Sequence, residues 1–114
     1  MVLFDDGAPR QVLPFDGEAW LHPWVLGDRT ADDVFSEVRD AVEWESRSII
    51  IFGRETLQPR LAAWYGDESY TYSNLTLEAR PMPSALEHLR SVCETLAGAR
   101  FNSVLANLYR DGND

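Results

Sequence analysis

The sequence has no lysine, one cysteine, two histidines, and no apolar run near the roughly 20 residues that a membrane helix needs. A single cysteine cannot form an internal disulfide or a thiolate metal cluster, so Cys93 is predicted to be a small buried hydrophobe. The first residues lack the basic and long apolar regions of a signal peptide, which predicts a cytoplasmic protein. With 45% hydrophobic residues, the 114-residue chain is predicted to be one domain or part of one.

The net charge of −9 comes from 19 acidic residues against ten arginines. Nucleic-acid binding depends largely on cations that neutralise phosphates, so this balance fits a nucleic-acid enzyme poorly and leaves a target of another kind open. The excess is uneven, because residues 1–53 contain eleven acids and four arginines, whereas residues 54–114 contain eight and six. We expect the acidic half to form a solvated outer layer. Each arginine is able to bind a phosphate or carboxylate through two hydrogen bonds.

Two amphipathic helices are predicted. Thr30 precedes acidic residues as an N-cap, and the first helix is expected to end near Trp44. Its apolar residues recur at helical spacing and are Val34, Phe35, Val38 and Val42. Ser84 and Glu87 form a capping box for a second helix that ends near Gly98. The apolar stripe of this second helix consists of Leu86, Leu89, Cys93 and Leu96.

Strand-forming residues between and after the helices predict an α+β fold, preceded by an irregular lead segment. Residues 48–52 are an apolar, β-branched run that Gly53 ends, and residues 61–65 form a second strand after Pro59. A turn at residues 67–69 follows. Further strands are expected at residues 70–72, 75–78 and 103–109.

The final strand alternates with a period of two. One face carries Ser103, Leu105, Asn107 and Tyr109, and the opposite face, which is predicted to be core, carries Val104, Ala106 and Leu108. The first face ends in an amide and a phenol two residues apart, which are able to donate hydrogen bonds in the same direction to a small carboxylate. An exposed polar face on an edge strand is the alternative interpretation of this strand alone.

Several separated segments are similar to one enzyme family. In chain order they are Leu13-Pro14-Phe15-Asp16-Gly17 with His22-Pro23, Ile51-Phe52-Gly53-Arg54, Pro59-Arg60, Trp64-Tyr65-Gly66, Tyr70-Thr71-Tyr72-Ser73 and Asn107-Leu108-Tyr109. The series resembles the AlkB family of iron(II)- and 2-oxoglutarate-dependent dioxygenases. The resemblance covers nearly the whole chain but only the N-terminal part of the family's domain. It implies that residues 1–114 are a single partial domain, the N-terminal portion of a double-stranded β-helix (jelly roll) with two flanking helices.

The resemblance implies repair of alkylated DNA or RNA by oxidative demethylation of N-methylated bases, with Fe(II), O2 and 2-oxoglutarate. In such enzymes the target base is extruded and packs between aromatic groups. The implied substrate-binding residues are Trp64, Tyr70 and Phe52, with Trp64 as a stacking wall and Phe52 as an apolar wedge for duplex DNA. Core packing is the alternative for Trp64, and cross-strand aromatic packing is the alternative for Tyr70. For Phe52 a buried strand end is the favoured interpretation.

The resemblance also implies a set of co-substrate-binding residues. Asn107 matches the residue near the chelating end of 2-oxoglutarate, and Tyr109 matches the residue near its distal carboxylate. The whole implied set is Asn107, Tyr109, Tyr70, Tyr72, Thr71, Leu108, Trp44 and Leu105. Core packing remains an equal alternative for Trp44 and Leu105.

Iron is where the sequence departs from the family pattern. Enzymes of this class bind iron through two histidines and a carboxylate, and the resemblance places the His-x-Asp motif about ten residues after Tyr109, beyond Asp114. Neither His22 nor His88 matches a ligand, so no metal-binding or catalytic residue is assigned. The chain alone is expected to be inactive, and the alternative function is a non-catalytic module that binds nucleic acid or protein. Unpaired strand edges in a partial jelly roll also predict self-association.

Overall fold

The computed structural model describes residues 7–72 and 74–114 and, for Tyr72, the main chain alone. Two helices and several short strands confirm the predicted α+β class. In chain order the elements are β1 (Arg10–Gln11), β2 (Trp20–Leu21), α1 (Ala31–Ala41), β3 (Ser48–Ile51), β4 (Arg54–Leu57), β5 (Leu61–Gly66), β6 (Tyr70–Tyr72), β7 (Leu75–Leu77), α2 (Ser84–Ala97) and β8 (Ser103–Leu108). Among the described residues no helix is long and apolar enough to cross a membrane.

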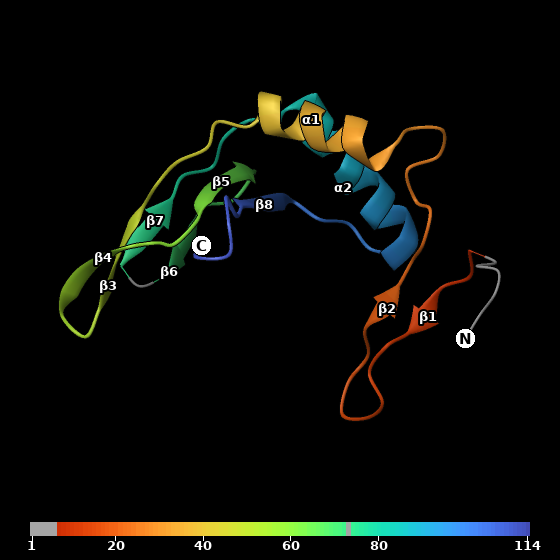
Figure 1. Ribbon diagram of the computed structural model, residues 1–114, viewed down its shortest axis with the longest axis horizontal. Coiled ribbons are helices and arrows are strands. Elements are labelled where there is room, and N and C mark those ends of the chain that lie inside the picture. Colours follow the sequence, from red (N-terminus) through yellow and green to blue (C-terminus); the bar gives the residue numbers. More distant parts are fainter. Residues whose placement is uncertain (1–6, 73) are drawn as a thin grey trace.

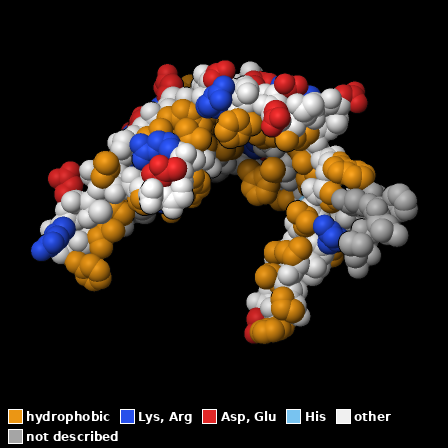
Figure 2. All heavy atoms as spheres, viewed as in Figure 1, with side chains coloured by type: hydrophobic (Ala, Val, Ile, Leu, Met, Phe, Trp, Pro, Cys, Tyr) orange, Lys and Arg blue, Asp and Glu red, His pale blue; other side chains and the backbone are white. Residues whose placement is uncertain are grey.

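The elements form an open arch. α1 and α2 lie at its crown, the β1–β2 hairpin forms one arm, and β3, β4, β6 and β7 form the other (Figure 1). The radius of gyration is 16.8 Å, whereas a compact domain of this length has a radius of about 13 Å. Acidic side chains gather on the outer side of the crown, and apolar side chains line the inner side of the arch (Figure 2). The inner side is therefore an apolar surface that these residues leave open.

α1 begins as its sequence predicts and ends earlier. The Thr30 hydroxyl accepts a hydrogen bond from the Asp33 N–H at 3.1 Å, which confirms the predicted N-cap. The helix ends at Ala41 because Val42 is extended and the next residue hydrogen-bonds to β5 instead of continuing the helix. The Glu43 N–H donates to the Tyr65 hydroxyl at 2.8 Å, which draws the chain toward β5. This contact between distant parts of the chain sets the end of the helix, and the spacing of apolar residues along the helix could not predict it.

α2 has the predicted end but not the predicted start. Its N-cap is Pro83, without a side-chain cap, so the predicted capping box of Ser84 and Glu87 is wrong. Pro83 is already extended, and extended backbone is what an N-cap requires. Gly98 ends the helix in the left-handed conformation, with φ at 64° and its N–H bonded to the Glu94 carbonyl at 2.9 Å.

Only the first half of α2 packs against the sheet. Leu86 is buried and Leu89 is half-buried, whereas Leu96 and Cys93 are exposed. The prediction of a buried Cys93 is therefore wrong. A cleft of about 1080 Å³ separates the second half of the helix from β5 and the start of β8. An apolar stripe predicts which face of a helix packs, but not how far along the helix the packing continues.

The strands form four two-stranded sheets, and the three pairs β1–β2, β3–β4 and β6–β7 are antiparallel hairpins. The sequence predicted β3, β5, β6, β7 and β8 but not β1, β2 or β4. All four residues of β4 are exposed, so β4 has no apolar alternation to reveal it. Phe52 and Gly53 connect β3 to β4 with φ angles of 50° and 73°. Positive φ at both positions is typical of the tight turn of a β-hairpin.

The core lies between the two helices and one face of the β5–β8 pair. Its buried members are Val42, Ala63, Tyr65 and Leu86, with Val38, Trp44, Met82, Leu89 and Val104 packed around them. The register pairs Tyr65 with Val104, and these residues face the helices. By the period of two, the residues between them face the other way. The predicted alternation of the final strand is confirmed, since Leu105 and Asn107 are exposed and Leu108 is half-buried.

Candidate functional site

A pair of stacked aromatic rings, one half-buried and one exposed, links β5 to β6. The rings of Trp64 on β5 and Tyr70 on β6 have centroids 5.1 Å apart and planes inclined by 22°. The Trp64 indole N–H donates to the Glu68 carbonyl at 2.5 Å, so the turn between the two strands also holds the ring. Tyr70 is 42% exposed. The pair forms an apolar platform that solvent reaches.

The β5–β8 register brings two residues of the final strand to the same face. Trp64 pairs with Leu105, and Ala62 pairs with Asn107. Leu105 is 43% exposed although it is apolar. The register therefore places Trp64, Leu105 and Asn107 on one face of the β5–β8 pair, and ring stacking brings Tyr70 of β6 beside Trp64. All four residues were singled out in the sequence.

Arg60 joins this group although sequence reasoning did not assign it a role. Its Nε donates to the Asn107 Oδ1 at 3.2 Å, across 47 positions of the chain. Arg60 precedes β5 and Asn107 lies near the end of β8, so antiparallel pairing brings them together. Only a predicted β5–β8 pairing could have revealed this contact. A guanidinium beside a side-chain amide is a set of donors suited to a carboxylate or phosphate.

Two other predicted co-substrate residues with hydroxyl groups are not joined to the aromatic pair by any described contact. They are Tyr109 and Thr71. Tyr109 follows β8 and is 59% exposed. The Thr71 hydroxyl is 2.9 Å from the Thr76 hydroxyl, so it forms part of the β6–β7 pair. The side chain of Tyr72 lies outside the described part of the structure. Tyr109 and Thr71 are thus not among the residues gathered around the aromatic pair by the described contacts.

Trp44 and Leu108 lie on the helix side of the β5–β8 pair. The Trp44 indole N–H donates to the Arg39 carbonyl at 3.0 Å, and its ring packs against the core. A cleft of about 300 Å³ lies between α1 and the end of β8, and Trp44, Leu108 and Asn107 are among its lining residues. Asn107 therefore adjoins both the open face and this cleft.

Phe52 lies at the tip of the β3–β4 hairpin with its side chain fully exposed. The favoured prediction of a buried strand end is therefore wrong, because the two-residue turn directs Phe52 away from the rest of the chain. Ile50, Ile51 and Leu57 on the same hairpin are also exposed. Apolar side chains accordingly mark the free end of this arm (Figure 2).

The described residues do not fit iron. Among them no group of three or more histidines, cysteines, aspartates or glutamates is arranged to hold a metal ion. His22 follows β2, and His88 is an exposed residue of α2. We therefore derive no metal-dependent step from these residues.

The loop after Tyr109 is closed by an ion pair. Arg110 donates to Asp114 from its backbone N–H at 2.8 Å, from Nε at 2.7 Å and from Nη2 at 2.9 Å. These hydrogen bonds lower the pKa of the Asp114 carboxyl to about 2. The carboxylate is therefore charged at neutral pH and fixes the direction in which the chain leaves β8.

Comparison with curated proteins places these features in one family, although no family model matches the chain. Over 95 residues the chain is 40% identical to alpha-ketoglutarate-dependent dioxygenase alkB homolog 3 of Bos taurus, a match that covers 82% of this chain and 33% of the relative. It is also 40% identical over 96 residues to DNA oxidative demethylase ALKBH2 of Mus musculus, covering 79% and 40%. The chain belongs to the AlkB homologue family.

Membership of the AlkB homologue family confirms the resemblance inferred from the motifs. Alkb homolog 3 of Homo sapiens is 38% identical, again over 82% of this chain. The family consists of Fe(II)- and 2-oxoglutarate-dependent dioxygenases. The chain spans about a third of the length of the curated relatives it matches.

Proposed function

We propose that this chain supplies the base-binding face, and part of the 2-oxoglutarate site, of an AlkB-like dioxygenase that demethylates N-methylated bases in DNA or RNA. One observation carries the proposal. Half-buried Trp64 stacks on exposed Tyr70, and the strand register places Leu105 and Asn107 beside them. An extruded base needs a flat apolar partner to replace the stacking that it loses, and this pair offers one.

The chemistry of a methylated base fits an aromatic platform on an acidic chain. Methylation at N1 of adenine leaves the base positively charged, and a cation over a tryptophan or tyrosine ring gains about 0.5–2 kcal/mol. The net charge of −9 then favours the damaged base over a neutral one, although it disfavours phosphates. Selectivity for the methylated base follows from the same charge that weakens binding to the backbone.

Asn107 and Tyr109 are the residues we propose for 2-oxoglutarate, together with Arg60. The co-substrate has two carboxylates, and amide, phenol and guanidinium groups are hydrogen-bond donors to carboxylates. In the family, 2-oxoglutarate bound with iron supplies two of the electrons that reduce O2, and the methyl group that is oxidised supplies the other two. The residues of this chain bind and orient it. Arg60 also holds Asn107 through Oδ1, which fixes the direction of the amide.

We propose two further assignments on the same basis. The antiparallel β5–β8 and β6–β7 pairs are part of a double-stranded β-helix, within one domain. The β3–β4 hairpin contacts duplex DNA through Phe52, whose exposure meets the first requirement for an apolar wedge. A cytoplasmic location remains a prediction from sequence.

Fluorescence anisotropy with a short oligonucleotide that contains one 1-methyladenine tests the base-binding role. We expect the chain to bind this oligonucleotide more tightly than the unmodified one, and Trp64→Ala to weaken binding about tenfold, because base–aromatic stacking contributes about 1–3 kcal/mol. Trp20→Ala is the matched control, since Trp20 is exposed on β2 in the other arm. Equal affinity for both oligonucleotides would contradict the proposal.

A formaldehyde-release assay separates the catalytic family function from a non-catalytic binding module. We expect no turnover of the methylated oligonucleotide by residues 1–114 with added Fe(II) and 2-oxoglutarate, because the described residues hold no metal-binding group. Formaldehyde release by this chain would overturn that expectation. Methyl-selective binding without turnover remains consistent with the base-binding role.

A further inference from the structure

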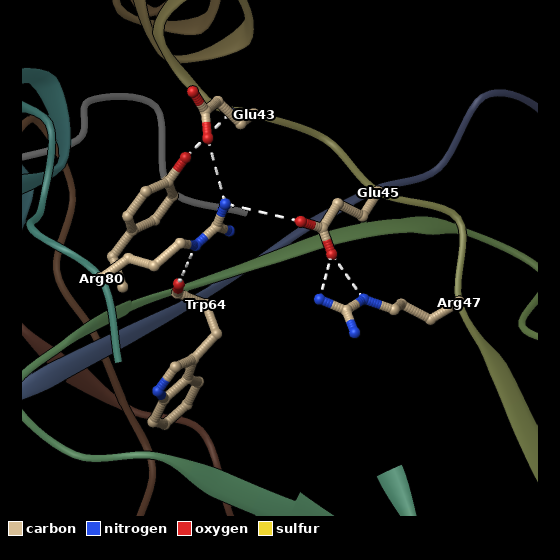
Figure 3. Close-up of polar contacts among 6 residues, drawn as sticks. Glu43, Glu45, Arg47, Trp64 and Arg80 are labelled. Atoms are coloured by element: carbon tan, nitrogen blue, oxygen red, sulfur yellow. Dashed lines mark hydrogen bonds and ion pairs between the residues drawn. The ribbon is translucent and has the colours of Figure 1, made fainter. Parts of the chain in front are cut away.

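Arg80 lies at the centre of an ion cluster beside the Trp64 backbone. Its Nη1 is 3.1 Å from the Glu43 Oε2 and 3.5 Å from the Glu45 Oε1, and Glu45 also pairs with Arg47 (Figure 3). The Arg80 side chain is 26% exposed, which is less than any other arginine in the ion pairs described here. The cluster therefore joins the connection after α1 to the segment after β7.

Arg80 also forms hydrogen bonds with the backbone of β5 on the edge opposite β8. On this edge Ala62 exchanges two hydrogen bonds with Glu45, both at 2.9 Å. Further along, Arg80 Nε donates to the Trp64 carbonyl at 3.3 Å, and the Gly66 N–H donates to the Arg80 carbonyl at 2.8 Å. Alternate residues of a strand direct their peptide groups to the same edge, so Arg80 takes the place of a neighbouring strand at Trp64.

A third set of contacts fixes the direction of the guanidinium. Arg80 Cζ lies 4.6 Å from the centroid of the Tyr65 ring, within the range of a cation–π contact. The Tyr65 hydroxyl accepts the Glu43 N–H at 2.8 Å, and the Glu43 carboxylate pairs with Arg80. The three residues form a closed ring of interactions, so Arg80 cannot rotate without breaking several of them.

We propose that Arg80 is a positioning residue that sets the orientation of the Trp64–Tyr70 ring pair by holding the Trp64 peptide. This inference rests on the proposed function in one respect, namely that the ring pair binds a base. The guanidinium is required because it donates to the Trp64 carbonyl and to two carboxylates at once while lying over the Tyr65 ring. A lysine supplies the charge but not this planar set of donors.

The variants Arg80→Gln and Arg80→Lys test the proposal in the full 114-residue chain. The structural readout is the NMR signal of the Trp64 indole N–H and the Tyr70 ring protons, with Trp64→Phe used to assign the former. We expect both Arg80 variants to shift these signals. Arg39→Gln is the matched control, because Arg39 pairs with Asp40 on exposed α1 and is expected to leave both signals in place.

Titration with 1-methyladenosine monophosphate provides the functional readout. We expect Arg80→Lys to weaken binding about tenfold while its thermal unfolding midpoint stays close to that of the unchanged chain, because a displaced contact group loses affinity without unfolding the protein. A purely structural role would instead lower the midpoint with no selective change at Trp64. If Arg80→Gln does not fold, Arg80→Lys still carries the test.

The outcomes for Arg80 and for the proposed function are separable. Trp64 and Tyr70 signals that are unchanged in Arg80→Lys would overturn the positioning role, as would full affinity in that variant. Shifted signals in a chain that has no preference for the methylated nucleotide would support the positioning role and contradict the base-binding function.

Discussion

At the scale of single residues, three contacts fix the position of Trp64. Its ring stacks on Tyr70, its indole N–H is bound by the Glu68 carbonyl, and its own carbonyl accepts from Arg80. Two of these contacts come from the turn before β6 and the start of that strand, and the third comes from the segment after β7. A half-buried tryptophan held by three contacts presents its ring to a ligand at low entropic cost.

Asp114 provides a pH-dependent prediction at the same scale. Its pKa is lowered to about 2 by hydrogen bonds from Arg110, whereas an unperturbed aspartate has a pKa of about 3.9. The ion pair therefore contributes stability above about pH 4, and this contribution is lost as the pH falls from there through about 2. We expect a carbon-13 NMR titration to show this low pKa, and Arg110→Gln to restore the ordinary value. An ordinary pKa in the unchanged chain would contradict the ion pair.

At the scale of elements, α2 allows a comparison of two leucines on one helix. Leu86 is 3% exposed in the core, whereas Leu96 is 40% exposed near the end of the helix. We expect Leu86→Ala to lower the free energy of unfolding by about 2–5 kcal/mol and Leu96→Ala to change it by about 0.5 kcal/mol or less. Denaturant titration measures both. Equal losses would mean that the whole helix is packed.

Gly66 is the element-scale test of the β5–β8 pair. A Cβ at Gly66, where φ is 141°, would collide with the backbone of Asn102 and Ser103. We expect Gly66→Ala to destabilise the chain by about 2 kcal/mol or more, because neither backbone segment moves easily. Gly112→Ala is the control, since a Cβ there has open space around it. Unchanged hydrogen-exchange protection of β8 in Gly66→Ala would contradict the observed register.

The elements also show what the sequence could predict. Five strands were predicted from local signals. These signals are β-branched or aromatic residues in β3 and β6, alternation in β7 and β8, and, for β5, an apolar run after Pro59. β4 was not predicted, since all its residues are exposed, and the buried Cys93 was wrongly predicted because a stripe does not reveal where packing stops. The shared face of Trp64 and Leu105 needed the strand register, and the Arg60–Asn107 contact needed it too.

At the scale of the whole molecule, the arch leaves apolar residues and strand edges uncovered. The radius of gyration exceeds that of a compact domain, and many large apolar side chains are exposed, including Phe15, Trp20, Trp24 and Phe52. Such surfaces favour association. We expect sedimentation velocity to show a sedimentation coefficient that rises with concentration. A monomer with a single sharp unfolding transition at all concentrations would contradict this expectation.

The most direct test of the proposed base-binding face is chemical-shift mapping with an oligonucleotide that contains one 1-methyladenine. We expect the largest changes at the Trp64 indole N–H, the Tyr70 ring and the Leu105 methyl groups, and smaller changes with the unmodified oligonucleotide. Changes confined to Trp20 and Trp24 in the other arm, or equal changes with both oligonucleotides, would contradict the assignment of this face to a methylated base.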